Sequence, residues 1–434
     1  MKNVREIALS LLLKWESEGE YINLTLGGVT NTLSDGDRRR LTALLYGTVE
    51  RKITLDYWIA TLTRGKTLTS TARNLLRMGL YELTFMHTPA HAVVNETVSL
   101  SAHRGEAALI NGVLRRAVRE PDSLTYPPRE KNEARYLSVC YSVPQPTVKR
   151  LREVLGDGTE DFLIAVNRRA PLTLRVNTLK IDRETFLARL REAGISAAPT
   201  KWAPCGVTLT DDRPVREIPG FEAGWFFVQD EASQISTAVL DPQAGETVLD
   251  VCACPGGKSF GAAITMGNVG KVHAYDLHAS KLSLITDGAR RLGIGSLTAE
   301  AHDACESMPE WVDRADRVIC DVPCSGLGVL GKKADLRYKD PAVMDTLPPL
   351  QTAILETVSQ YVKVGGTLLY STCTVNPREN RAVVDAFLAA HPTYVLVPFS
   401  CGSLSAPDGD LTLYPHTHAT DGFYIANLER RAHD

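Results

Sequence analysis

Residues 249–260 read LDVCACPGGKSF: an apolar run, a Pro-Gly-Gly turn and the start of a helical pattern. Gly256 and Gly257 allow the backbone to approach a ligand closely, and the free amide groups at the start of a helix attract anions. The stretch has neither the G-x-G-x-x-G pattern nor the upstream glycine of a Walker loop. Alone, it indicates either a nucleotide-like ligand or a purely structural turn.

The surroundings of this stretch decide the fold class. Short apolar runs alternate with helical patterns from residue 226 onward, which predicts βαβ crossovers and a largely parallel, doubly wound sheet. Ligands of such sheets bind beyond the carboxyl ends of the strands. We predict six strands: TVLDVCA (247–253), KVHAYDL (271–277), SLTAEAHD (296–303), DRVICDVP (316–323), GTLLYSTCT (366–374) and GFYIANLER (422–430).

Acidic residues end three of these strands in succession. Asp276 ends the second, about twenty residues after the glycine turn, where a carboxylate can accept both hydroxyl groups of a ribose. Asp303 ends the third, near the expected place of an adenine ring, and Asp321 ends the fourth. The series favours a cofactor with ribose and adenine over unrelated surface charges. Asp276 would repel a 2′-phosphate, which argues against NADP.

Two cysteines stand at the ends of later strands. Cys324 lies in ICDVPCSGLG (319–328) and Cys373 in YSTCTVNPREN (370–380). Most cysteines of this kind are small buried side chains. Two thiols at the ligand-binding edge of one sheet instead favour covalent, nucleophilic chemistry.

The remaining cysteines carry less information. Nine cysteines are an odd number and do not suggest a disulfide framework. The pairs Cys252/Cys254 and Cys320/Cys324 have no neighbouring histidine, so we expect no structural zinc and no other metal. We interpret five as buried reduced thiols: Cys140, Cys205, Cys305, Cys320 and Cys401.

The front of the chain reads as all helix to about residue 120. MKNVREIALSLLLKWESEGE (1–20) has helical apolar spacing without the features of a secretory signal, and no window has the ~18 apolar residues of a membrane helix. We therefore expect a cytoplasmic protein. We predict an all-helical domain at 1–125, a small α+β subdomain at 136–225 that binds RNA or links its neighbours, and the doubly wound domain at 226–434. PDSLTYPPREKNEAR (121–135) is a predicted linker.

Charge is distributed unevenly along the chain. The net charge is −3, yet residues 1–135 hold 19 Lys and Arg against 15 Asp and Glu, and the rest holds 29 against 36. A mildly basic front is compatible with a polyanionic partner. Arg115, Arg116 and Arg119 are expected on the outer side of a helix whose other side is apolar.

The motifs together resemble a known family. CACPGGK, DVPCSGLG, YSTCTVNPREN and DGFYIANLE look like the motif series of the RNA 5-methylcytosine methyltransferases. LLRMGLYELTFMHTPAHAVVNETVSLSAH (75–103) and INGVLRRAV (110–118) are similar to the RNA-binding domain of the NusB antitermination factors. The combination resembles the Sun or Fmu branch, which acts on bacterial small-subunit rRNA, over nearly the whole chain. Cys254, where the family usually has Ala, and Lys332 and Lys333, where it usually has Arg-Arg or Arg-His, are departures.

This resemblance implies a fold, a reaction and site residues. The fold would be a Rossmann-like class I methyltransferase domain with a mostly parallel seven-stranded sheet, preceded by a NusB-like all-α domain and a small α+β segment. The protein would be a monomer that binds S-adenosylmethionine and small-subunit (16S) rRNA. Cys373 would be the nucleophile, Cys324 would act in product release, and Asp321 would contact the cytosine. The implied cofactor-binding residues are Cys252, Ala253, Cys254, Pro255, Gly256, Gly257, Lys258, Asp276, Asp303 and Asp321.

The chemistry itself explains a need for thiols. C5 of cytosine is a poor nucleophile until a thiolate adds at C6, and a second group must then help the adduct to collapse. Three alternatives stay open. Methyl transfer to an exocyclic amine is disfavoured, because that reaction uses an Asn/Asp-Pro-Pro-aromatic run where this chain reads D-V-P-C. A non-enzymatic RNA-binding factor would not need the two thiols, and tRNA is an alternative substrate that the catalytic motifs do not exclude.

Overall fold

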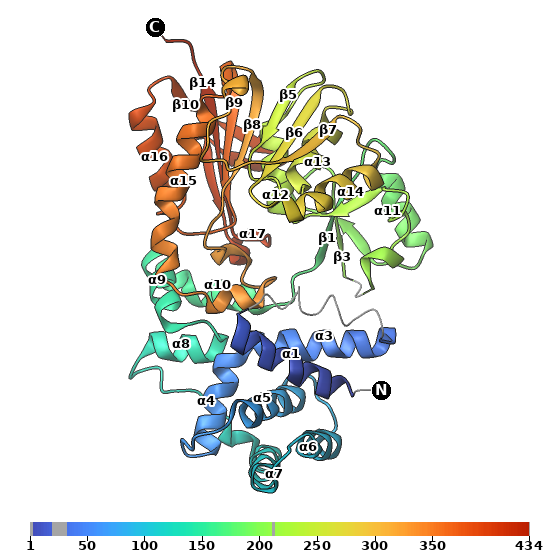
Figure 1. The fold of residues 1–434 in the computed structure, drawn as a ribbon, viewed down its shortest axis with the longest axis vertical. Helices are drawn as coiled ribbons and strands as arrows, with labels where there is room; N and C mark the ends of the chain where they lie inside the picture. The colour runs from blue at the N-terminus through green and yellow to red at the C-terminus, as the bar shows by residue number, and fades with distance from the viewer. Residues whose placement is uncertain (1–2, 20–32, 211–212, 434) are drawn as a thin grey trace. The chain divides into compact units, whose positions relative to one another are not determined.

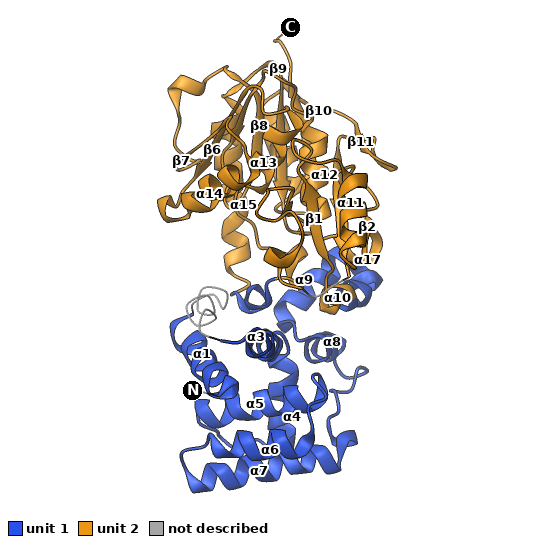
Figure 2. Ribbon diagram, turned by 90° about the vertical axis from the view of Figure 1, so that its right-hand side faces the viewer, with its two compact units in different colours: residues 1–164, 333–339 blue, residues 165–332, 340–434 orange. Residues whose placement is uncertain are grey.

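A computed structural model describes residues 3–19, 33–210 and 213–433. The chain forms two compact units: residues 1–164 with 333–339, and residues 165–332 with 340–434 (Figure 2). In the described ranges no helix is long and apolar enough to cross a membrane. This division follows the contacts between residues, and the domain boundaries predicted at residues 125 and 225 do not coincide with it. These domain boundaries stay a prediction.

The first unit is helical in its described residues, as the sequence predicts. Side chains cap several helix starts by accepting a backbone N–H, for example Thr69 from Ala72 at 3.1 Å and Asn132 from Arg135 at 2.9 Å. The helices are α1 (Val4–Glu18), α3 (Asp35–Glu50), α4 (Lys52–Leu62), α5 (Ser70–Thr84), α6 (Ala90–Ser99), α7 (Arg104–Arg119), η2 (Pro121–Ser123), α8 (Glu133–Tyr141), α9 (Gln145–Leu155), η3 (Gly156–Gly158) and α10 (Thr159–Asn167), the last of which crosses the division at 164. The predicted linker therefore ends inside α8.

A later piece of the chain completes the core of this unit. The short helix η8 (Ala334–Tyr338) packs on α3, and Ala334 belongs to the unit's apolar core. The Tyr338 hydroxyl donates to the Val49 carbonyl at 2.6 Å, and the buried Arg337 guanidinium lies 3.3 Å from the Glu50 carboxylate. The sequence pattern of residues 333–339 does not predict that they pack in the core of the first unit.

The second unit is built on a doubly wound sheet (Figure 1). Its strand order is β10-β14-β9-β8-β5-β6-β7, with β13 beside β14. Strands β5 to β9 run parallel to one another, and β14 runs antiparallel to β9. The strands are β5 (Thr247–Asp250), β6 (Lys271–Asp276), β7 (Leu297–Ala301), β8 (Ala315–Asp321), β9 (Val362–Thr372), β10 (Tyr394–Leu396), β13 (Asp410–Leu413) and β14 (Phe423–Arg430). All six predicted strands are confirmed.

Helices cover both faces of this sheet. Successive strand residues face opposite sides, so Ile319 joins the core under one helical layer and Cys320 the core under the other. One layer holds α12 (Glu231–Leu240), α13 (Gly257–Thr265) and α14 (Leu282–Leu292); the other holds α15 (Val343–Ser359) and α16 (Arg381–Ala390) (Figure 1). β11 (Phe399–Cys401), β12 (Leu404–Ala406) and α17 (Pro415–His418) lie in the connections before β14.

A small antiparallel sheet precedes the large one. Its order is β2-β3-β1-β4, and α11 packs beside it. Asp182 caps α11 by accepting the Thr185 N–H at 2.9 Å, and Gly194 follows its end with φ +70°. The elements are β1 (Leu172–Val176), α11 (Arg183–Glu192), β2 (Ala197–Pro199), β3 (Gly206–Leu209) and β4 (Phe226–Val228). The α+β pattern thus begins at β1, after three helices that the sequence did not single out.

Candidate active site

The two thiols meet at the carboxyl edge of the large sheet. β8 and β9 are parallel neighbours, and their register pairs Asp321 with Ser371. Cys324 and Cys373 follow these two residues by three and two positions, so both loops leave the same edge. Their Sγ atoms lie 3.1 Å apart. The sequence predicts each thiol at a strand end, and the register of the two strands brings the thiols together.

A hydrogen bond and burial keep Cys324 protonated. Hydrogen bonding to Cys373, and then burial, raise the pKa of Cys324 well above its ordinary value. The Cys324 thiol therefore stays neutral, and a neutral thiol can donate a hydrogen bond to the Cys373 sulfur 3.1 Å away.

The glycine turn connects β5 to α13. Gly256 has φ +105°, and a Cβ atom there would lie 2.5 Å from the Phe260 ring, so only glycine fits. The helix starts at Gly257 with its first amide groups directed back toward the turn. The Asp276 carboxylate at the end of β6 accepts the N–H of Cys254 at 3.1 Å and of His278 at 3.0 Å. The turn and the predicted ribose carboxylate are therefore in direct contact.

Lys258 and Asp321 form an ion pair at the same edge. Lys258 Nζ lies 2.5 Å from one Asp321 oxygen, and the Ser371 hydroxyl donates to the other at 2.7 Å. Lys258 is almost completely buried and lies over the Phe423 ring. The structure thus joins a residue of the predicted cofactor loop to the carboxylate that precedes Cys324.

The other predicted site residues occupy the surrounding loops. Asp303 lies two residues beyond the end of β7, and its carboxylate accepts the Cys305 N–H at 2.9 Å within its own loop. Burial raises the pKa of Cys252 well above its ordinary value, so its thiol stays neutral. Ala253 is buried, whereas Pro255 is exposed.

Two carboxyl groups in this region were not singled out from the sequence. Asp250 ends β5, and its buried side chain accepts the Ser259 hydroxyl at 2.6 Å; burial raises the pKa of Asp250 to about 7. The strand-end rule that found Asp276 could also have found Asp250. Glu379 is fully buried beside the thiol loops, and no sequence pattern distinguishes it from a surface glutamate.

The remaining cysteines are free thiols. Of the five interpreted as buried, Cys320 and Cys401 are buried. Cys140, Cys205 and Cys305 are only partly buried, which corrects the prediction for them, because loops or helix surfaces leave one side of each open. Across the described ranges, no group of three or more His, Cys, Asp and Glu side chains is placed to hold a metal ion.

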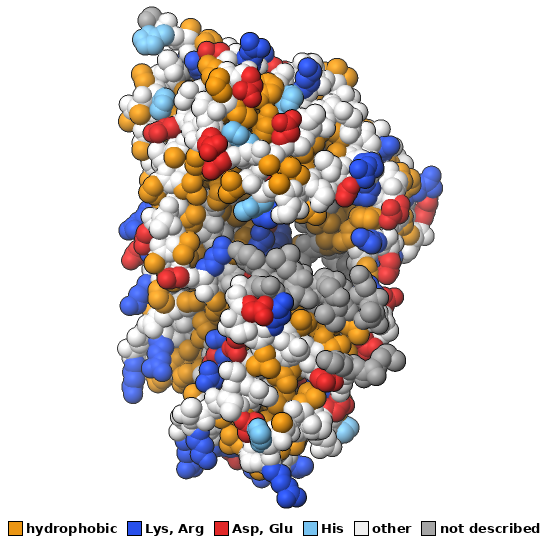
Figure 3. All heavy atoms as spheres, in the orientation of Figure 1, with side chains coloured by type: hydrophobic (Ala, Val, Ile, Leu, Met, Phe, Trp, Pro, Cys, Tyr) orange, Lys and Arg blue, Asp and Glu red, His pale blue; other side chains and the backbone are white. Residues whose placement is uncertain are grey.

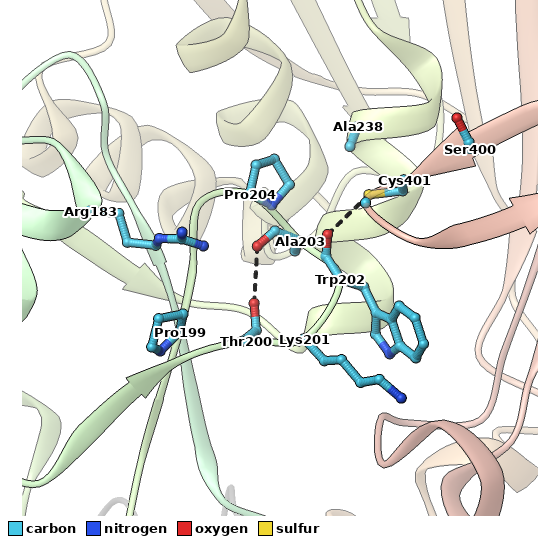
Figure 4. A pocket seen from close by; sticks show the side chains of 11 residues that line it. Arg183, Pro199, Thr200, Lys201, Trp202, Ala203, Pro204, Ala238, Ser400 and Cys401 are labelled. Carbon is cyan, nitrogen blue, oxygen red and sulfur yellow. Dashed lines mark hydrogen bonds between the residues drawn. The ribbon is translucent and has the colours of Figure 1, made fainter.

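A separate pocket in the second unit is lined by neither Cys324 nor Cys373 (Figure 4). It has a volume of about 450 Å³ and is lined mainly by residues 199–204 and 400–402. The Cys401 thiol donates to the Trp202 carbonyl at 3.5 Å across it, and Lys201 lies over the Trp202 ring. None of the predicted site residues lines this pocket.

Comparisons with known proteins agree with this architecture. The model of the 16S rRNA methyltransferase RsmB/F family matches residues 237–429, that of the NusB family residues 2–119, and that of an RsmF/B-like ferredoxin-like domain residues 143–216. The probable ribosomal RNA small subunit methyltransferase B of Synechocystis sp. is 36% identical over 99% of this chain and 100% of its own. The Bacillus subtilis protein of the same description is 35% identical over 99% of both.

Solved structures give the same relationship. The crystal structure of PH0851 superposes with a TM-score of 0.81 at 29% identity, over 99% of this chain and 98% of the other. A methyltransferase homolog protein from Pyrococcus horikoshii gives 0.61 at 26% identity, over 69% of this chain and 99% of the other. From the fold, the thiol pair and these full-length matches, the chain belongs to the RsmB/F family of 16S rRNA methyltransferases.

Proposed function

We propose that this enzyme methylates C5 of a cytosine in 16S rRNA, with S-adenosylmethionine as methyl donor and with a covalent bond between Cys373 and C6 of the base. The observation that carries the proposal is the Cys324–Cys373 pair, whose sulfurs lie 3.1 Å apart at the ligand-binding edge of the sheet. A methyl transfer to an exocyclic amine needs acceptors and a stacking ring in place of these thiols.

The residues around the glycine turn suit S-adenosylmethionine. A Cβ atom on Gly257 would approach Gln229 Nε2 to 3.3 Å, so a side chain at this position would be tightly packed. Each oxygen of Asp276 accepts one backbone N–H and has a further lone pair for a ribose hydroxyl. We propose that 252–258, Asp276 and Asp303 hold the cofactor, and that Asp321 adjoins both the cofactor and the base.

Binding of the cofactor would supply an electrophilic methyl group. Cys373, as thiolate, adds to C6 of the cytosine, and this addition makes C5 nucleophilic. After C5 is methylated, water takes the C5 proton, the C5–H electrons re-form the C5=C6 double bond, and the C6–S bond breaks to release Cys373 as a thiolate. The neutral Cys324 thiol, 3.1 Å from the Cys373 sulfur, can donate a hydrogen bond to the departing thiolate and so stabilise it. The Lys258–Asp321 pair holds the edge of the site in place.

A bisulfite experiment tests the reaction and the substrate together. RNA from a deletion strain should lack one 5-methylcytosine in 16S rRNA, and the intact gene should restore it whereas the Cys373→Ala gene should not. Loss of a tRNA site in place of an rRNA site would transfer the proposal to tRNA. Unchanged 5-methylcytosine in both RNAs would refute it.

The cofactor assignment gives a direct binding prediction. Asp276→Ala removes two acceptors for ribose hydroxyl groups, so S-adenosylmethionine should bind more weakly by about 1–3 kcal/mol, the scale of lost charge-assisted hydrogen bonds. Titration calorimetry measures the change. Asp287→Ala, which removes an exposed carboxylate paired only with Arg290 on α14, is the control and should bind normally. Equal affinities for the two variants would remove Asp276 from the site.

We further propose that the helical unit recruits the RNA. Figure 3 shows Lys and Arg side chains in the area occupied by α6 and α7. On α7, Ile110, Val113 and Leu114 are buried, whereas Arg115 and Arg119 are exposed and Arg116 is partly exposed. This amphipathic helix presents its cations to solvent, where they can contact phosphates.

Replacing Arg115, Arg116 and Arg119 together by Gln should weaken RNA binding. Each lost phosphate contact lowers the slope of log affinity against log salt by about one, so the slope should fall by up to about three. Filter binding at several salt concentrations measures it. The matched control replaces three exposed cations of the second unit, Lys271, Arg290 and Arg431, and should leave the slope unchanged. Equal salt-dependence slopes for the two triple variants would show that the arginines of α7 do not contact RNA phosphates.

A further inference from the structure

The Glu379 carboxylate lies fully buried between the loops that carry the two thiols. One of its oxygens, Oε2, accepts the Ser325 backbone N–H at 2.8 Å and Gln351 Nε2 at 3.1 Å. The other, Oε1, accepts Asn376 Nδ2 at 2.8 Å. All three donors are uncharged. A carboxylate is costly to bury unless hydrogen bonds compensate, so these contacts are needed to hold it there.

Each oxygen of this carboxylate serves a different loop. Ser325 directly follows Cys324, and Asn376 lies in the turn directly after Cys373. A second bond joins the same loops, because the hydroxyls of Ser325 and Thr374 lie 2.7 Å apart. The residues next to the two cysteines are therefore connected twice, once through Glu379 and once directly.

We propose that Glu379 is a positioning residue that fixes the separation of the Cys324 and Cys373 sulfurs. The inference rests on the proposed function, because the separation matters to the reaction only if the two thiols act in sequence on one base. Glu379 acts on the positions of the sulfurs through Ser325 and Asn376, and its charge is one of the lesser causes that raise the pKa of Cys324. The nucleophile and the group that assists its departure then keep one geometry through the reaction.

The isosteric variant Glu379→Gln tests this most directly. The amide has one acceptor oxygen, so its NH₂ group must face either the Ser325 N–H or the Asn376 NH₂, and one loop is released. A displacement near 1 Å in an active site lowers rates by up to 100-fold. We expect kcat to fall by about 10- to 100-fold, with the KM values for RNA and S-adenosylmethionine unchanged.

Tyr370→Phe is the matched control. The Tyr370 hydroxyl donates to the backbone carbonyl of Glu379 at 2.6 Å, so its loss affects the same turn but leaves the carboxylate contacts in place. This variant should keep kcat within about threefold of the wild type, the effect of about half a kcal/mol. An equal loss of kcat in Tyr370→Phe and Glu379→Gln, or a change in KM alone, would overturn the positioning role.

A cross-linking measurement tests the geometry without any RNA. Diamide takes one hydrogen atom from each of two thiols, is reduced to the hydrazine, and leaves a disulfide. Wild-type protein should form the Cys324–Cys373 disulfide, identified by peptide mass spectrometry, about tenfold faster than Glu379→Gln. Asn376→Ala, which releases only the loop of Cys373, should also form the disulfide more slowly than the wild type. This variant tests the positioning role if Glu379→Gln does not fold.

The two measurements separate the two proposals. Equal cross-linking rates in wild type and variants would overturn the role of Glu379, whatever the methylation assay gives. Slower cross-linking in the variants, combined with a wild-type protein that methylates no RNA, would support the positioning role and refute the proposed reaction.

Discussion

Cys373→Ala should abolish methylation and prevent any covalent RNA–protein species from forming. The variant lacks the thiolate that adds to C6, so C5 is never made nucleophilic. Cys324→Ala should behave differently, because attack and methyl transfer remain possible while the departing Cys373 loses the neighbouring thiol, 3.1 Å away, that can stabilise it. The methylated adduct should then accumulate. The target base must leave any stack to reach the thiols, as base-modifying enzymes require.

A denaturing gel distinguishes these outcomes. Cys324→Ala incubated with RNA and S-adenosylmethionine should give a slow band that ribonuclease removes, and the double variant should give none. Cys205→Ala, which changes a partly buried thiol outside the site, serves as the control and should turn over like the wild type. A band with Cys373→Ala in place of Cys324→Ala would reverse the two roles. Normal methylation by both single variants would make the thiols packing residues only.

Arg5→Met should cause a large loss of stability in the helical unit. Arg5 Nε and Nη2 lie 2.6 and 2.8 Å from the two oxygens of Glu82, and both side chains are fully buried. Removing the arginine leaves the Glu82 carboxylate buried without its main partner. The partly exposed Arg40 guanidinium, 3.2 Å from Glu82, compensates its charge only in part. Breaking a buried pair from one side costs about 3–5 kcal/mol. Urea unfolding followed by circular dichroism measures the loss.

The same helix provides the control. Lys14 and Glu18 on α1 form an exposed pair at 3.4 Å, and Lys14→Met should cost less than about 1 kcal/mol. The double variant Arg5→Met/Glu82→Met should be more stable than Arg5→Met alone, because no unpaired charge remains buried. Equal stability of Arg5→Met and Lys14→Met would show that the Arg5–Glu82 pair contributes little beyond its packing.

Local patterns were sufficient to predict six strands of the large sheet and the helical character of residues 1 to about 120. Alternating apolar strands and helical segments predicted the doubly wound sheet. Strands of such a sheet are covered by helices on both faces, so they read as short apolar runs in the sequence. The glycine turn and Asp276 could be placed because both depend on chain positions next to a strand end. The motifs also resembled one family, and the full-length matches confirm that membership.

The sequence alone determined which residues stand at strand ends, and the tertiary structure decided which of them meet. The register of β8 against β9 brings Cys324 to Cys373, and the fold joins Lys258 to Asp321 and encloses Glu379 between the two loops. It also places η8 in the core of a unit formed mostly by residues far earlier in the chain. Such contacts depend on how distant segments pack, and the same short sequence is compatible with a buried or an exposed position until those neighbours are fixed.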